Sequence, residues 1–590
     1  MSLILSRRDM DFLLFEWLDI EALLSADRYV EHDRATIDAV IDLASSMAEE
    51  MFAPFNKLSD QREPKLRDDG QVEMPAETGA ALRAFCDAGL MSMSQPAEVG
   101  GMQLPFVVEK AAFAWFQAAN AGTSGYALLT TAAANLLLEH GSPEQIEAYV
   151  KPMLAGRFFG TMCLSEPQAG SSLADVRTRA VPQGDGSFRL FGNKMWISGG
   201  EHDLAESIVH LVLARIEGAT AGIKGLSLFV VPRDLPGGVR NDVVLAGLNH
   251  KMGQRGTVNT LLNFGEGRHR PGGAGGAIGW LVGHAGQGLA CMFTMMNEAR
   301  VAVGTSAATL GYTGYLHALD YARGRPQGRV PGNKDPESKQ VPLVRHADVR
   351  RMLLAQKAYA EGALGLNLYC ARLVDVQRTT SGGARDEAEL LLDLLTPIAK
   401  SWPSQWCLAA NDLAIQVHGG YGYTRDYNVE QFYRDNRLNP IHEGTHGIQG
   451  IDLLGRKVAM QGGRALDIFA AAVADSCGRA DAAGLDEPAL LLRKAFADVQ
   501  RTNGVLQAEL SAEARLANAS LFLEAFGHVT LAWIWLEQAI AAAGKEGAFY
   551  DGKRTAAHYF FTYELPKVGP MLALLSAGDR TTLDLDPDTL

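Results

Sequence analysis

The chain has 590 residues, of which 47% are hydrophobic and 21% are charged. This length corresponds to about four units of ~150 residues, and the composition excludes a disordered or collagen-like chain. Its 54 Lys and Arg against 68 Asp and Glu give a formal net charge of −14, which argues against a nucleic-acid partner because a phosphate backbone needs a basic surface.

Six cysteines are scattered along the chain without a CxxC pair, which predicts neither disulfides nor a zinc ribbon and fits a reducing, cytoplasmic environment. Charges interrupt Met1–Asp11 where a signal peptide has its apolar run. The most apolar stretch, Leu521–Leu536, contains Glu524 and His528. We therefore expect a buried helix there and no integral membrane segment.

The first part of the chain has helical periodicity. Apolar residues between Ile37 and Met51 recur at intervals of three and four, which places them on one helical face. Similar patterns cover Glu77–Leu90 and Phe106–His140, with breaks at glycine and proline between them. The pattern predicts an N-terminal helical domain over residues 1–157.

Short β-rich runs replace this pattern over about 158–265. Turn residues separate them and no long helix intervenes, which favours an antiparallel sheet or barrel over βαβ units. We interpret Gly275–Gly279, in the glycine-rich segment that follows, as a flexible connector. A central antiparallel β-domain is thus predicted over residues 158–280. Its runs are Phe158–Leu164, Phe188–Ile197, Ile208–Ile216, Leu226–Val231 and Val258–Phe264.

Helical periodicity returns after about Gly288 and continues to about Ser576. We divide this part into a C-terminal helical bundle over residues 281–462 and an additional C-terminal helical domain over residues 463–590. The predicted fold class is α+β multidomain, with helical, β, helical and helical parts in chain order.

Three segments carry the motifs of one family. Residues 163–171 and 194–200 read CLSEPQAGS and KMWISGG, residues 416–423 read QVHGGYGY, and residues 433–445 include YRDNR and IHEGT. Together they resemble the acyl-CoA dehydrogenases, which are FAD flavoproteins, over roughly residues 35–457. The additional C-terminal domain and residues 280–297 are similar to the long subgroup that contains 3-methylmercaptopropionyl-CoA dehydrogenase.

Dehydrogenation of an acyl thioester needs a base for the α-proton, an oxidised flavin for the β-hydride, and hydrogen-bond donors for the carbonyl oxygen. A carboxylate whose pKa is raised towards neutrality by burial is a suitable base. The resemblance implies that Glu443 is this base, and that its backbone N–H and a flavin ribityl hydroxyl hold the thioester oxygen.

The resemblance also implies how FAD is held. Trp196 would cover the isoalloxazine ring, Ser198 would reach its N5 edge, and Ser165 its pyrimidine edge. The GGYG glycines permit close approach of the backbone to the pyrophosphate, with contacts partly supplied by a neighbouring subunit. The expected FAD contacts are Leu164, Ser165, Gly170, Ser171, Trp196, Ser198, Arg325, Gln416, Gly419, Gly420, Gly422 and Thr445.

For the substrate, Arg300 is expected to bind the adenine-ribose or phosphate end of CoA. Asn297 and Ser172 each stand where the family usually has aspartate, so the CoA contacts of this chain differ there from the family pattern. The expected substrate contacts are Ser171, Asn297, Arg300 and Gly444.

The segment from His442 to His446 also matches the zinc-protease motif HExxH. That motif requires both histidines on one face of a continuous helix and a third ligand downstream. Pro440 precedes the segment, Gly444 interrupts it, and the next glutamate is the distant Glu487. No metal site is therefore predicted.

The resemblance implies an enzyme that oxidises an acyl-CoA to a trans-2-enoyl-CoA, as in fatty acid β-oxidation, and passes electrons to electron-transfer flavoprotein. An acyl-CoA oxidase that uses oxygen and a catalytically silent flavin-binding scaffold remain the alternatives; the net charge and Glu443 argue against the scaffold. We expect a homodimer in which the additional domain packs on the helical bundle, the other hypothesis being an independently folded, tethered domain.

Overall fold

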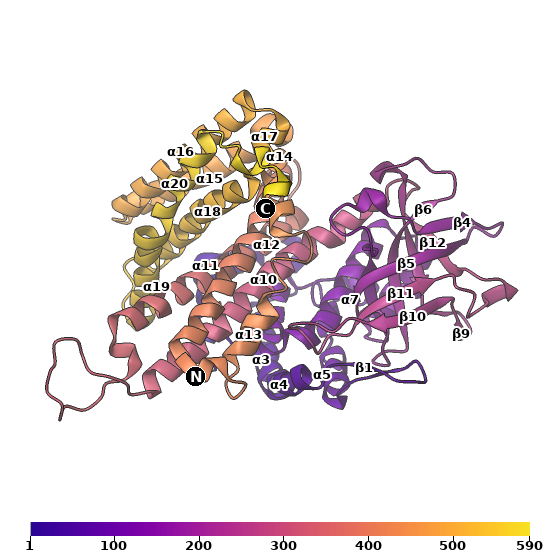
Figure 1. Cartoon of the computed structure of the whole chain (residues 1–590), viewed down its shortest axis with the longest axis horizontal. Coiled ribbons are helices and arrows are strands. Elements are labelled where there is room, and N and C mark those ends of the chain that lie inside the picture. Colours follow the sequence, from indigo (N-terminus) through magenta and orange to yellow (C-terminus); the bar gives the residue numbers. More distant parts are fainter. Residues whose placement is uncertain (1) are drawn as a thin grey trace. The chain divides into compact units, whose positions relative to one another are not determined.

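The computed structural model describes residues 2–590, which form two compact units (Figure 1). Unit 1 consists of residues 2–39, Pro105–Ala118 and Arg300–Leu590, and unit 2 of Val40–Leu104 and Ala119–Ala299. Helices α3 (Arg34–Met47) and α10 (Gly288–Gly324) contribute residues to both units.

Unit 2 is built on an eight-stranded sheet with the order β10-β11-β5-β12-β7-β6-β3. Strand β4 pairs with both β5 and β6, so that β5, β12, β7, β6 and β4 close into a ring. The sheet is mainly antiparallel, as predicted, but β6 pairs in parallel with β3 and β4. The strands are β3 (Phe158–Cys163), β4 (Arg179–Pro182), β5 (Phe188–Ser198), β6 (Ser207–Ile216), β7 (Leu226–Pro232), β10 (Val243–Leu248), β11 (Asn259–Phe264) and β12 (Ala277–Val282).

All five predicted β-runs are strands in the structure, within one or two residues at each end. The interpretation of Gly275–Gly279 as a flexible connector is wrong, because β12 begins at Ala277 and pairs with β5 and β7. Gly279 serves close packing there, since a Cβ atom would lie 2.7 Å from the Val231 side chain.

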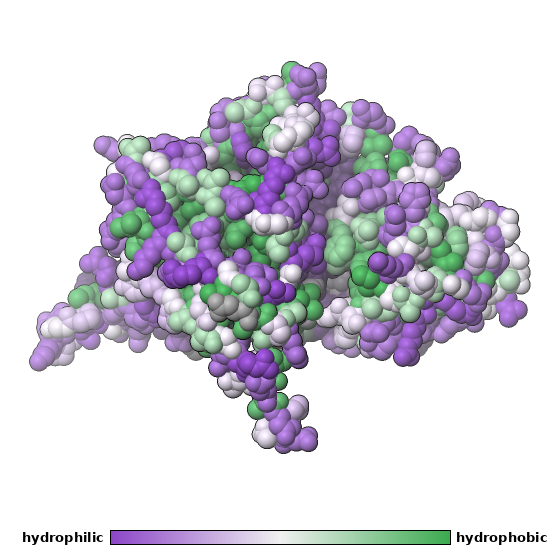
Figure 2. Space-filling view, turned by 90° about the horizontal axis from the view of Figure 1, so that it is seen from above, coloured by the Kyte–Doolittle hydropathy of each residue, from purple (hydrophilic) through white to green (hydrophobic). Residues whose placement is uncertain are grey.

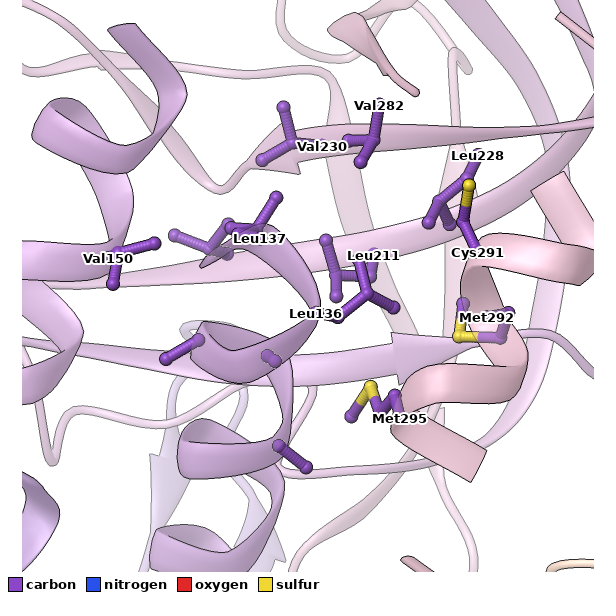
Figure 3. Packing of buried hydrophobic residues seen from close by; sticks show 14 of the residues in the cluster. Leu136, Leu137, Val150, Leu211, Leu228, Val230, Val282, Cys291, Met292 and Met295 are labelled. Carbon is purple, nitrogen blue, oxygen red and sulfur yellow. The ribbon is translucent and has the colours of Figure 1, made fainter. Parts of the chain in front are cut away.

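A hydrophobic core joins α7 (Ala121–His140) to the sheet of unit 2 (Figure 3). Leu136 and Leu137 pack with Leu211 and Leu228 of the sheet, and Met292 from the start of α10 completes the cluster. Each such side chain contributes roughly 1.5–3 kcal/mol by its burial. Unit 2 also contains α4 (Asn56–Gln61), α5 (Ala76–Asp87), α8 (Pro143–Gln145), α9 (Lys151–Leu154) and the short strands β1 (Lys65–Leu66), β2 (Val72–Glu73), β8 (Asp234–Leu235) and β9 (Val239–Arg240).

Unit 1 is helical, and its long helices α11 and α12 pack against each other. Helix α12 continues through Pro397 and Pro403, although each proline removes a backbone donor. The bundle helices are α6 (Phe106–Ala119), α11 (Ala347–Thr379), α12 (Gly383–His418), α13 (Val429–Asn436) and α14 (His446–Gly455), and α1 (Arg7–Asp11) and α2 (Ile20–Leu23) precede them in the chain.

The additional C-terminal helices pack on this bundle in the same compact unit (Figure 1). Trp535 of α18 donates from Nε1 to the carbonyl of Ala358 in α11 at 3.0 Å. Of the residues described, α18 alone is long and apolar enough to cross a membrane, and 83% of its most apolar window is buried, which confirms the predicted buried helix. The helices are α15 (Arg464–Ala482), α16 (Asp486–Glu509), α17 (Ala512–Leu516), α18 (Ala519–Ala541), α19 (Ala548–Tyr559), α20 (Val568–Ser576) and α21 (Thr581–Asp584).

Residues 2–39 belong to unit 1 and not with the remainder of the predicted N-terminal domain. Glu16 accepts hydrogen bonds from Lys545 at 2.8 Å and Tyr550 at 2.7 Å, and Trp17 donates to Glu537 at 3.2 Å. The N-terminal segment is therefore tied to the C-terminal helices, while the four-domain division of the sequence stays a prediction.

Candidate active site

Glu443 lies in a tight turn between α13 and α14. Its φ is +52° and that of Gly444 is +85°, and a non-glycine residue in this left-handed region is uncommon and marks a site to inspect for function. Thr445 caps α14 by accepting a hydrogen bond from the Ile448 N–H at 3.3 Å. His442 precedes the helix and His446 begins it, so the HExxH segment is not a continuous helix.

Three side-chain hydrogen bonds hold the backbone of this turn. Gln449 donates from Nε2 to the carbonyl of Glu443 at 3.0 Å. Lys400 of α12 donates from Nζ to the carbonyls of Asn439 at 2.7 Å and Gly444 at 2.8 Å. No residue from 2 to 590 accepts a hydrogen bond from the Glu443 backbone N–H, so this donor is available to a ligand.

Burial raises the pKa of the half-buried Glu443 carboxyl, against the opposing charges of Arg300 and Lys400. Burial lowers the pKa of Lys400 to about 7, with Glu443 acting in the opposite direction. A carboxylate whose pKa is shifted towards neutrality and an adjacent free backbone donor are the two groups that removal of an α-proton requires.

Arg300, which is expected at the adenine-ribose or phosphate end of CoA, is a buried residue of α10. The residue is 4% exposed, and its guanidinium lies 3.5 Å from Asp452 of α14. It also lowers the pKa of Glu443. The buried guanidinium therefore contributes to the electrostatic surroundings of Glu443, and the contact of Arg300 with CoA stays a prediction.

A cavity of about 660 Å³ lies at the C-terminal end of α12, within unit 1. Gly419, with φ +63° and ψ −140°, and Gly420 line it, and a Cβ atom on either would meet nothing within 4 Å. Arg325 and Gln416 also line it, and all four are exposed. An exposed cation beside open glycine backbone fits an anionic group such as a pyrophosphate.

Gly422 does not line this cavity. It is buried, and a Cβ atom would lie 2.6 Å from the carbonyl oxygen of Ile415. Its glycine identity therefore serves packing of the loop on the end of α12.

In unit 2, Trp196 stands near the end of β5 with φ +64° and a side chain that is 58% exposed. A bulky residue in this conformation on a strand is a genuine outlier. The neighbouring Met195 N–H donates to the Ser165 carbonyl at 3.0 Å, which brings the end of β3 beside it. Ser198 accepts a hydrogen bond from Asn259 at 3.2 Å. An exposed indole with nearby hydroxyls fits one wall of a flavin site.

The remaining predicted residues occupy the segments next to these. Leu164 is buried at the end of β3, whereas Gly170 and Ser171 are exposed in the loop that follows. The neighbouring Ser172 donates to Asp175 at 2.7 Å. Asn297 is half-buried on α10. The structure thus gathers the predicted residues into a Glu443 turn and a glycine cavity in unit 1 and a Trp196 edge in unit 2.

A buried ion pair that the sequence analysis missed organises the Trp196 edge. Lys194 donates to Glu166 at 3.0 Å and to the Leu164 carbonyl at 2.9 Å. Glu166 also accepts from the backbone N–H groups of Arg177 at 2.8 Å and Thr178 at 3.0 Å. Burial opposes ionisation, but Lys194 and these hydrogen bonds lower the pKa of Glu166 to about 2. A lysine inside a β-run was the available indication.

Comparison with known proteins defines the class. The acyl-CoA dehydrogenase models match residues 38–157 for the N-terminal domain, 161–265 for the middle domain and 286–458 for the C-terminal domain. A fourth model, acetyl-CoA dehydrogenase C-terminal like, matches residues 469–586. The chain belongs to the acyl-CoA dehydrogenase family and is an oxidoreductase of that class.

Individual relatives are similar over most of their length. The chain is 39% identical to the 3-methylmercaptopropionyl-CoA dehydrogenase of Ruegeria pomeroyi, over 80% of this chain and 78% of that one. It is 34% identical to the broad-specificity linear acyl-CoA dehydrogenase FadE5 of Mycobacterium tuberculosis, over 98% of both chains.

A solved structure shares the fold over nearly the whole chain. An acyl-CoA dehydrogenase from Bacillus anthracis complexed with FAD superposes with a TM-score of 0.73 at 18% identity, covering 98% of this chain and 95% of that one. The cofactor of the chain is FAD.

Proposed function

We propose that this acyl-CoA dehydrogenase converts a saturated acyl-CoA to a trans-2-enoyl-CoA with Glu443 as the catalytic base. The observation that carries the proposal is the turn at Glu443, where a carboxyl with a raised pKa and an unpaired backbone N–H occur in one residue. Bound FAD supplies the acceptor for the β-hydride. The step balances as a two-electron oxidation: the Cα–H bond gives a proton to Glu443, the Cβ–H bond gives a hydride that would reduce the cofactor, and a Cα=Cβ bond forms in the product.

The residues of the turn divide the remaining work. The Glu443 carboxylate takes the α-proton and the Glu443 N–H donates to the thioester oxygen, which gains negative charge as that proton leaves. Gly444 leaves the approach to this N–H free of a side chain. A Cβ there would also lie 2.5 Å from Gln449, the residue that holds the Glu443 carbonyl.

Two groups of residues are proposed to hold FAD. Leu164, Ser165, Trp196 and Ser198 would hold the flavin end, and Arg325, Gln416, Gly419 and Gly420 the pyrophosphate and adenine end. The second group would act partly from the second subunit of a homodimer. Light scattering should give a dimer, and a monomer that retains FAD would contradict this arrangement.

We propose electron-transfer flavoprotein as the electron acceptor and the cytoplasm as the location; the six cysteines, which are all free, support a reducing compartment. The oxidase alternative is tested by reducing the enzyme anaerobically and mixing it with either air or electron-transfer flavoprotein. Reoxidation at a catalytic rate by the flavoprotein alone supports a dehydrogenase, and rapid reoxidation by air supports an oxidase.

The names of the relatives support a linear or sulfur-containing acyl group as substrate. The test is a panel of acyl-CoAs of increasing length, including a methylthio-substituted propionyl-CoA, mixed anaerobically with the yellow enzyme. Bleaching of the flavin absorption by at least one member is expected. A protein that binds FAD and bleaches with none of them is a silent scaffold.

A further inference from the structure

Lys400 differs from every other buried lysine in the part of the chain that the structure describes. Five lysines are buried, and four of them lie within 3.0 Å of a carboxylate oxygen. Lys400 has no carboxylate oxygen within 4.0 Å among residues 2–590, and its ammonium group contacts two backbone carbonyls. Burying a charge without a counter-ion destabilises the folded protein. A lysine at this position therefore suggests a role other than stabilising the fold. The four paired lysines are Lys110, Lys194, Lys457 and Lys553.

The two carbonyls belong to the two sides of the Glu443 turn. Lys400 reaches Asn439 four residues before Glu443 and Gly444 one residue after it. Asn439 is itself fixed, since its side chain donates to Asn436 at 2.9 Å and bonds to His442 at 3.1 Å. The ammonium group therefore links the two sides of the turn.

We propose that Lys400 is a positioning residue for Glu443, whose ammonium group clamps the turn at Asn439 and Gly444 and whose charge favours the ionised carboxylate. This inference rests on the proposed role of Glu443 as the base. Clamping the Gly444 carbonyl fixes the peptide between Gly444 and Thr445, on the C-terminal side of Glu443. A catalytic group must be held to within about half an ångström of its productive geometry.

Lys400 and Arg300 are the two cations that act on the Glu443 carboxyl, and the other titratable groups near the turn are neutral or act on other residues. Arg300 from α10 also faces Glu443, but Asp452 from α14 neutralises it in part. Burial lowers the pKa of His442 to about 3 and of His446 to about 4, so both are neutral at physiological pH. Glu524 from α18 faces His446 at 3.5 Å, and Asp393 and Arg456 act on Arg300 and not directly on Glu443.

The charge of Lys400 affects the pH dependence of the reaction through the pKa of Glu443. A nearby cation lowers the pKa of a carboxyl, so removal of the Lys400 charge raises the pKa of Glu443. Because the pKa of Lys400 is about 7, its cation is present on the acid side, where Glu443 ionises. Without it, the acid limb of the rate profile moves to higher pH by about one unit.

The experiment compares Lys400→Met and Lys400→Arg with the wild-type holoenzyme, using the pH dependence of anaerobic flavin bleaching by acyl-CoA. The matched control is Lys457→Met, which removes a buried lysine that pairs with Asp393 at 2.7 Å and does not touch the turn. Lys400→Met should bleach at least tenfold more slowly at pH 7 with its acid limb raised. Lys400→Arg should keep the wild-type limb, as should Lys457→Met.

Hydrogen exchange of the FAD-loaded proteins gives a second measurement that does not depend on turnover. Peptides that cover residues 437–449 should exchange faster in Lys400→Met while the rest of the chain is unchanged. Lys457→Met should not show this local change. If Lys400→Met does not fold with FAD, Lys400→Gln, which keeps one donor but no charge, takes its place.

The outcomes separate the two proposals. A wild-type enzyme that no acyl-CoA bleaches overturns the proposed function, and hydrogen exchange then still tests the clamp. A charge-free variant with an unmoved acid limb overturns the electrostatic role of Lys400. Unchanged exchange over residues 437–449 overturns the clamp.

Discussion

Lys194 in unit 2 and Lys400 in unit 1 are both fully buried, and both donate to the backbone of a segment that carries predicted site residues. They differ in their counter-charge. Lys194 meets the Glu166 carboxylate at 3.0 Å, whereas Lys400 meets only carbonyl oxygens. Burial lowers the pKa of both, and a glutamate opposes the shift in each case: Glu166, in direct contact, at Lys194, and Glu443, without direct contact, at Lys400.

The difference shows two ways to use a buried charge. In the Lys194–Glu166 pair the two opposite charges neutralise each other, and the pair holds the loop after β3 in place. The charge of Lys400 is not neutralised by a carboxylate in direct contact, and it acts on the nearby Glu443 carboxyl, whose pKa it lowers. Each lysine also lies beside a non-glycine residue at positive φ, Trp196 at +64° and Glu443 at +52°. Figure 2 shows that the surface in view carries many hydrophilic residues with hydrophobic ones between them.

The strongest way to test this contrast is Glu443→Gln, which keeps the shape of the side chain and removes its basicity. Loss of a general base costs roughly 10²–10⁴-fold in rate, so anaerobic flavin bleaching should fall by that factor while FAD content stays unchanged. Glu430→Gln is the control, since Glu430 pairs with Arg434 at 2.7 Å in α13. Near wild-type bleaching in Glu443→Gln would remove Glu443 from the mechanism.

Lys194→Met should act on stability and not on the chemical step. Breaking a buried pair leaves Glu166 uncompensated, which typically costs about 3–5 kcal/mol, and the Leu164 carbonyl loses its donor. We expect a lower thermal midpoint and a loss of FAD from the purified protein. An exposed lysine such as Lys334→Met should leave both unchanged. If Lys194→Met keeps its midpoint, the pair does not fix the loop.

Much of the fold can be predicted from the sequence, because the spacing of apolar residues along a helix or strand reflects which face is buried. The β-rich runs between turn residues and the three-and-four spacing near Ile37 predicted elements that the structure contains. Burial of individual charges is not recorded in this way: the segment Thr396–Trp402 contains a lysine in an apolar helix, but only three-dimensional packing shows what Lys400 contacts. In the same way, the sequence does not show that Arg300 of α10 lies beside Asp452.

Likewise, sequence alone shows which residue types are present but not their backbone angles. Trp196 reads as an ordinary strand aromatic, and its positive φ is visible only in the structure. The GGYG motif predicts the same FAD contact for Gly422 as for Gly419 and Gly420, and only the structure shows that Gly422 is packed against the carbonyl of Ile415.

Titration should separate the two glutamates by opposite signs. The pKa of Glu166 is lowered to about 2 from an ordinary value of 4.5, so its contribution to stability is present above about pH 4.5 and is lost as the pH falls towards 2. The pKa of Glu443 is raised, so the folded state loses stability as the pH rises above the ordinary value.

Urea unfolding of Glu166→Gln and Glu443→Gln against wild type at pH 4 to 8 measures this contrast. The stability deficit of Glu166→Gln should be largest, about 3 kcal/mol, at neutral pH and should shrink towards pH 4. The free energy of unfolding of Glu443→Gln should instead increase relative to that of the wild type as the pH rises. Parallel curves for the two variants would mean that the difference between the two turns is not electrostatic.

The smallest effects are expected at Trp196, where backbone strain and cofactor contact can be separated. The side chain is 58% exposed, so its removal costs little packing, and glycine accepts the left-handed conformation that tryptophan and alanine do not. Trp196→Gly should therefore be more stable than Trp196→Ala by about 1 kcal/mol.

Both variants should bind FAD roughly three- to tenfold more weakly, because an aromatic contact contributes about 0.5–1.5 kcal/mol. Tyr563→Ala, at a similarly exposed aromatic residue in unit 1, is the control for FAD affinity. Equal stability of the glycine and alanine variants would show that the strand holds residue 196 in this conformation without strain, and unchanged FAD affinity would show that the exposed indole does not face the cofactor.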